Sequence, residues 1–140
     1  MKTMRLSAEE IAQQQLLQAL RLWHEGDYVS AITLAGASEE ILGKRLRKIG
    51  KEPSFDSIKN FVMLIARKNG DVDPSSEKTI AQLMNSTRNE LKHYAGDESL
   101  EFDLKADSIE LIERAISNFT QLTGLVHDDM YKFWDETSSS

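Results

Sequence analysis

Apolar residues recur every three to four positions through most of the chain, which is the spacing of amphipathic helices. Strand signals are weak, and the breaks between the periodic stretches fall at glycine and proline. The pattern predicts long helices at about 7–25, 28–49, 54–69, 73–95 and 104–123, and a short one at about 125–134. Short connections imply antiparallel neighbours. The predicted fold class is therefore all-α, an antiparallel helical bundle of four to five core helices plus a short C-terminal helix.

Residues that cap helices support these bounds. Ser7, followed three residues later by Glu10, is typical of a capping box, and Asp27 is expected to cap the second helix. Gly26, Gly50 and Gly124 are predicted helix ends. We expect residues 1–140 to form a single domain, with its core at about 7–123 and a frayed tail at 135–140.

A carboxylate interrupts the apolar face of the helix predicted at 28–49. That face consists of Tyr28, Ala31, Ile32, Ala35, Leu42, Leu46 and Ile49, and Glu39 falls inside it. A buried carboxylate is costly unless it is paired. Glu39 either lies at the edge of the face and reaches water, or it is buried and orients an arginine or histidine from another helix. Its neighbour Glu40 is the alternative residue for that role.

The two later long helices differ in their apolar faces. The helix at 104–123 is apolar on two sides, so it is either central in the bundle or part of a subunit interface. The helix at 73–95 has one predicted core face, formed by Ile80, Leu83, Met84, Thr87, Leu91 and Tyr94. Arg88 lies at the flank of this face, and Asn89 and His93 face outward.

The amino-acid composition excludes several kinds of chemical site. The 140 residues carry a net charge of −6 and include no cysteine, which excludes disulfides, thiolate zinc sites and cysteine nucleophiles. The three histidines lack metal-binding spacing, and no glycine-rich phosphate loop occurs, so neither a metal nor a cofactor is expected. No signal peptide and no apolar run of membrane-spanning length is present, so a cytoplasmic protein without membrane contact is expected.

A basic cluster stands out in this acidic chain. The polar face of the helix at 28–49 carries the cluster, and Arg45 lies at its flank; its members are Lys44, Arg47, Lys48 and Lys51. Such a cluster is usually a solvated face that is favoured by the helix C-terminus. The functional alternative is a surface that holds the phosphates of RNA.

The sequence RNELKH, Arg88 to His93, combines three groups suited to RNA cleavage. His93 can take or give a proton near neutral pH, Arg88 can bind phosphate and stabilise its charge, and Asn89 can orient either group. Lys92 is a further candidate for phosphate binding. Arg88 and His93 diverge by about 140° around the helix, so a second copy of the helix is needed to complete one site. DNA lacks the reacting 2′-hydroxyl and is not an expected substrate.

This combination resembles the HEPN superfamily, the higher eukaryotes and prokaryotes nucleotide-binding domains. Its hallmark is an arginine followed by four to six residues and a histidine, often with a polar residue after the arginine. RNELKH matches it, and DYVSAITLAGASEEILGKRL resembles the family's earlier core helix, with Glu39 or Glu40 and Lys44 in the matching places. The resemblance covers roughly residues 16–122.

The resemblance implies a homodimer with a composite, metal-independent endoribonuclease site. It also implies a toxin or defence role with a nucleotidyltransferase-type antitoxin as partner. In one toxin subgroup a tyrosine two residues after the histidine is modified, but Tyr94 follows His93 directly. Two alternatives stay open: a non-catalytic HEPN-like module that binds a nucleotide or a protein, and a structural bundle with a surface histidine.

Overall fold

A computed structural model describes residues 3–68, 76–94, 96, 99 and 102–138. Side chains are described throughout these ranges except at positions 66, 67, 76, 77, 92 and 93. The described residues form seven α-helices and no strand, which confirms the predicted all-α helical bundle. The helices are α1 (Ala8–His24), α2 (Tyr28–Lys48), α3 (Ser54–Lys68), α4 (Ser76–Met84), α5 (Ser86–His93), α6 (Leu104–Thr123) and α7 (Asp128–Ser138).

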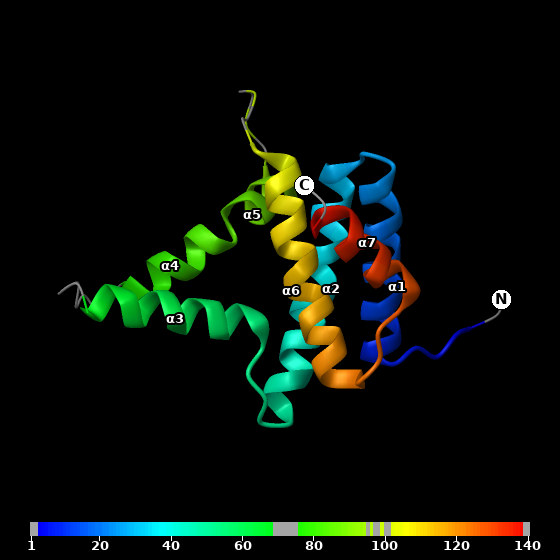
Figure 1. The fold of residues 1–140 in the computed structure, drawn as a ribbon, viewed down its shortest axis with the longest axis horizontal. Helices are drawn as coiled ribbons and strands as arrows, with labels where there is room; N and C mark the ends of the chain where they lie inside the picture. The colour runs from blue at the N-terminus through cyan, green and yellow to red at the C-terminus, as the bar shows by residue number, and fades with distance from the viewer. Residues whose placement is uncertain (1–2, 69–75, 95, 97–98, 100–101, 139–140) are drawn as a thin grey trace.

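The body of the molecule is built on α1, α2 and α6, which lie side by side (Figure 1). Ser7 and Glu10 form the predicted capping box, and Gly124 ends α6 with a left-handed φ of 71°. The core contains apolar residues from all three helices, including Leu16, Ile32 and Ile116. Because α6 packs against α1, α2 and α3, its two apolar sides are explained by a central position in the bundle.

The C-terminal helix differs from its predicted bounds. α7 begins at Asp128, three residues later than expected, and continues to Ser138. Its start is set by His127, whose Nδ1 accepts a hydrogen bond from the Asp129 amide at 3.1 Å. Met130 and Phe133 are buried against the core and hold the helix in place. The expectation of a frayed tail is therefore wrong for residues 135–138, and residues 139–140 lie outside the described part.

In the described part of the helix predicted at 73–95, the chain forms two helices with a break at Asn85, and residues 73–75 and 95 lie outside that part. Arg114 of α6 binds the break, since its Nη1 donates to the Met84 carbonyl at 3.5 Å and its Nη2 to the Asn85 side chain at 3.0 Å. The prediction of one continuous core face across this segment is wrong. Leu83 and Tyr94 are exposed, and Tyr94 follows the end of α5 in an extended conformation.

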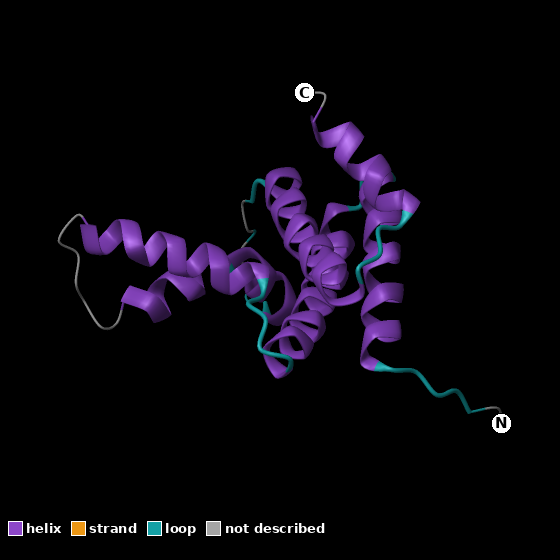
Figure 2. Ribbon diagram, turned by 60° about the horizontal axis from the view of Figure 1, so that its bottom comes forward, coloured by secondary structure: helices purple, strands orange, loops and turns teal. Residues whose placement is uncertain are grey.

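Helices α3 and α4 form an arm that projects from the body. Both ribbon views show the two helices extending away from α1, α2 and α6 (Figures 1 and 2). At the base of the arm, the Ser54 amide donates a hydrogen bond of 2.8 Å to the Asn118 side chain of α6. The chain then returns through α4 to α5, which packs on α2. No helix in the described ranges has the length and hydropathy that a membrane crossing requires.

Candidate functional site

A buried charge cluster joins α2, α5 and α6 at Glu39. The Glu39 side chain is 6% exposed, and its Oε1 accepts a hydrogen bond of 3.4 Å from Nη1 of Arg88. Its Oε2 accepts a second, short hydrogen bond from Nε of Arg114, which is also buried. The interpretation of Glu39 as a buried carboxylate that orients an arginine from another helix is confirmed, and the alternative of a solvated Glu39 is wrong.

The surroundings of Glu39 fix its position. The Asn118 side chain donates to the Glu39 carbonyl at 3.3 Å and also accepts from the base of the arm. The Arg114 guanidinium lies over the ring of Phe55, 5.2 Å from its centroid. Two arginines therefore share one buried carboxylate, and the cluster is enclosed by residues of the arm, α2 and α6.

Arg88 enters this cluster across a glycine. A Cβ at Gly36 would lie 2.3 Å from Cδ of Arg88, so the arginine stem occupies the space that any other residue would need. The Arg88 side chain is 17% exposed and borders three small cavities. One of them, of about 120 Å³, is also lined by Glu39, Glu40 and Arg47. Arg88 is thus held in place, with its head at the boundary between the core and solvent.

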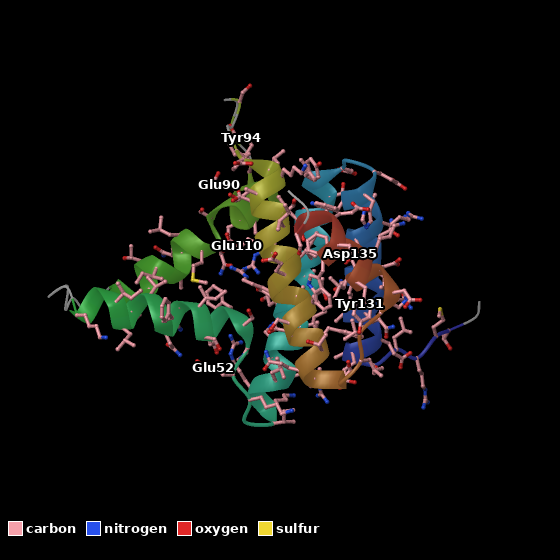
Figure 3. The ribbon with its side chains drawn as sticks, viewed as in Figure 1. Glu52, Glu90, Tyr94, Glu110, Tyr131 and Asp135 are labelled. Atoms are coloured by element: carbon pink, nitrogen blue, oxygen red, sulfur yellow. The ribbon has the colours of Figure 1, made fainter. Side chains whose placement is uncertain are left out.

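The rest of the RNELKH motif lies on the same short helix. Asn89 is exposed, and His93 is the last residue of α5. The side chains of His93 and Lys92 lie outside the described residues. Figure 3 shows Glu90 and Tyr94 at this end of the molecule, and Glu110 on α6 nearby. Tyr94 is 40% exposed, so the expectation that it points into the core is wrong.

Two of the predicted phosphate-binding cations, Arg47 and Lys44, have carboxylate neighbours. Arg47 donates to both oxygens of Asp56, from Nε at 3.0 Å and from Nη2 at 2.9 Å. This hydrogen bonding raises the pKa of Arg47 and lowers that of Asp56. Lys44 lies 3.8 Å from Glu40 on the surface, and Lys48 is exposed. Of these cations, Arg47 lines the same cavity as Arg88, whereas Lys44 and Lys48 do not.

Arg114, Asn118 and Gly36 belong to the cluster but were missed from the sequence. Asn118 lies next to Leu111 on an apolar face of the helix predicted at 104–123, whereas Arg114, four residues earlier, lies about 60° from Leu111 on the polar side. A polar residue at an apolar face is the signal that identified Glu39, and it could have identified Asn118, but it gives no indication of Arg114. Gly36 sits in the middle of a helix without a local reason, which indicates a close approach by another group.

A second polar site lies on the other side of the body, between α1 and α7. Nδ1 of His24 lies 2.9 Å from Oε2 of Glu136, and the adjacent open groove has a volume of about 800 Å³. The groove is lined by both cations and carboxylates, among them Arg21, Lys132 and Asp129. Within the described ranges, no three His, Asp or Glu side chains gather as metal ligands.

Comparison of the chain with protein-family models, with curated proteins and with solved structures gives no match.

Proposed function

We propose that the chain is a metal-independent endoribonuclease whose active site combines the RNELKH motifs of two copies. The position of Arg88 carries the proposal. A permanent cation, held by Glu39 and Gly36 at the boundary of the core, is oriented before any substrate arrives. Orientation of this kind is what stabilisation of a charged transition state requires.

The reaction assigned to the site is attack of a ribose 2′-oxygen on the neighbouring phosphodiester of the same RNA strand. His93 takes the proton of the ribose 2′-hydroxyl, and the oxygen attacks phosphorus. The bond from phosphorus to the 5′-oxygen breaks, and that oxygen leaves with a proton from the partner's His93. Arg88 stabilises the charge on the phosphoryl oxygens, and Asn89 orients the substrate. The products are a 2′,3′-cyclic phosphate and a 5′-hydroxyl.

Growth of cells that express the chain tests this activity. Wild-type expression is expected to slow growth, and His93→Ala is expected to relieve the effect, because it removes the proton-transferring group. His127→Ala is the matched control, since His127 lies at the start of α7 and is outside the motif. Equal growth with the wild type and with His93→Ala, together with intact RNA after incubation with the purified protein, would refute the proposal.

The second candidate is a non-catalytic HEPN-like module that binds a nucleotide or a protein. One observation favours it: Arg88 already has a carboxylate partner in Glu39, in a cluster that also serves to join α2, α5 and α6. If the module binds a nucleotide, that nucleotide raises the melting temperature of the wild type, and RNA stays intact; if it binds a protein, nucleotides leave the melting temperature unchanged. A nucleotidyltransferase-type antitoxin is the protein partner that the HEPN resemblance implies.

A further inference from the structure

The arm formed by α3 and α4 exposes large apolar side chains. Ile58, Phe61, Val62 and Ile65 have the spacing of one helix face, and each is at least 37% exposed. Phe61 is 62% exposed, and Leu83 on α4 is 69% exposed. Soluble monomers rarely expose a contiguous apolar patch of this kind. Two helices alone cannot enclose such a face, so a further layer has to cover it.

The charge distribution favours a second copy of the chain as that layer. Residues 54–84, which include the arm, contain four basic and four acidic residues, so the net charge of −6 belongs to the rest of the chain. Two copies that meet through their bodies bring like charges together, whereas two arms meet without net repulsion. A strongly basic partner would favour the acidic body over the neutral arm.

The size of the arm also suits a contact between copies. With 15 residues, α3 is about 22 Å long, and two helices side by side are about 20 Å wide. Because α4 has 9 residues and is only about 14 Å long, the face of the two helices is about 360 Å² in projection, and side-chain ridges make its accessible area larger. Small stable interfaces bury about 600 Å² on each partner, so an arm supplies most of such an interface.

We propose that two copies of the chain dimerise through these arms, which pack as a four-helix layer. Leu83 connects this surface to the RNELKH motif, because it lines the same cavity as Arg88 and Arg114. The dimer contact thus adjoins the motif of each copy. The inference stands on the arm alone: a dimer that leaves RNA intact would refute the proposed ribonuclease and would leave this interface in place.

Solution mass measurements on three variants test the interface. Sedimentation velocity of the wild type is expected to give twice the chain mass of 15.9 kDa at micromolar concentration. Phe61→Asp places a charge in the contact and is expected to raise the dimer Kd by about 30-fold or more, the factor that corresponds to about 2 kcal/mol at an interface hot spot. Leu83→Asp makes the same test on α4.

Leu125→Asp is the matched control, since Leu125 is 63% exposed but lies between α6 and α7, off the arm. This variant is expected to keep the mass of the wild type. Circular dichroism checks that each variant keeps its helices, which exposed positions allow. A monomeric wild type, a dimer that survives both arm substitutions, or equal dissociation by Leu125→Asp would overturn the proposal. A monomeric wild type would mean that the arm serves a different protein.

Discussion

Glu39 is the residue on which most of the described polar contacts of the candidate site converge. Its two carboxylate oxygens bind arginines from two helices, and its carbonyl accepts from Asn118. A buried ion pair gains little overall, because desolvation offsets the attraction, but the loss of one partner leaves the other charge buried and uncompensated. Removal of Glu39 takes away the carboxylate that Arg88 binds and leaves the buried Arg114 with only the surface carboxylate of Glu110, 3.9 Å from its Nη1, so the cluster depends mainly on Glu39.

Glu39→Ala is therefore expected to destabilise the fold by about 3–5 kcal/mol, as for other broken buried pairs. Glu40→Ala, one residue along, is the control: Glu40 is exposed and pairs with Lys44 at the surface, where such a pair contributes about 0–1 kcal/mol. Urea unfolding of both variants measures the difference. Similar losses in the two variants would show that the Glu39 cluster does not stabilise the fold.

The carboxyl groups of Asp56 and Glu113 are expected to change the stability of the fold with pH in opposite directions. Arg47 lowers the pKa of Asp56 below its ordinary value of 3.8, so the stability from this pair is present above pH 3.8 and is lost as the pH falls through the lowered pKa. Asp56→Asn is expected to melt at a lower temperature than the wild type at pH 7, with a difference that shrinks below pH 3.8. A constant difference across the acid range would contradict this assignment.

Glu113 is the opposite case. Glu113 is exposed, but its partial burial, together with the nearby charge of Glu110, raises its pKa above 4.5, so its ionised form weakens the fold slightly above that pH. Glu113→Gln is expected to melt at a higher temperature than the wild type at pH 7, and the gain disappears as the pH falls below 4.5. Thermal melts at several pH values measure both carboxyl variants together. A loss of stability in Glu113→Gln at pH 7 is the result that would argue against this sign.

At the scale of the elements, helices stabilised by their own sequence were predictable. The capping box at Ser7 and the stop at Gly124 fix the ends of α1 and α6, and both depend on neighbouring residues alone. The break at Asn85 was not predictable in this way. It is bound by Arg114, which lies 29 residues further along the chain. Because this contact forms only in the folded chain, the apolar spacing of residues 76–93 gives no sign of the break.

Alanine substitutions of two glycines in α2, Gly36 and Gly43, distinguish the effect of helix propensity on stability from the effect of contact with Arg88. A Cβ at Gly43 would lie 3.6 Å from Pro53, an ordinary contact, so Gly43→Ala is expected to stabilise the helix by up to about 1 kcal/mol. Gly36→Ala is expected to bring the same gain in helix propensity. Its new methyl group would, however, collide with the aliphatic part of the Arg88 side chain, and such overpacking costs about 1–3 kcal/mol.

Gly36→Ala is accordingly expected to lose stability where Gly43→Ala gains it, and to displace Arg88 from Glu39. Urea unfolding gives the sign for each variant, and the ribonuclease assay shows whether displacement of Arg88 lowers activity. Equal gains in both variants would mean that Arg88 moves aside without cost and that its position is not fixed by Gly36.

For the whole molecule, the sequence was sufficient for the fold class; it left the burial of Glu39 open between two alternatives and did not predict the arm. The apolar spacing at Ile58, Phe61 and Ile65 predicts a helix with a buried face. Whether the covering layer comes from the same chain or from another depends on the direction in which α3 leaves α2. That direction is set by contacts between distant residues, such as Ser54 with Asn118. An oligomeric site is therefore the part of this protein that a single sequence reveals least.

The ribonuclease assignment makes one chemical demand that can be measured directly. A DNA oligonucleotide with a single ribonucleotide in its sequence is incubated with the purified wild type in the presence of a metal chelator. The account predicts one cut, on the 3′ side of the ribonucleotide, with a 2′,3′-cyclic phosphate and a 5′-hydroxyl as ends, and no cut with His93→Ala. An intact oligonucleotide, or equal cutting of an all-DNA control, would contradict it.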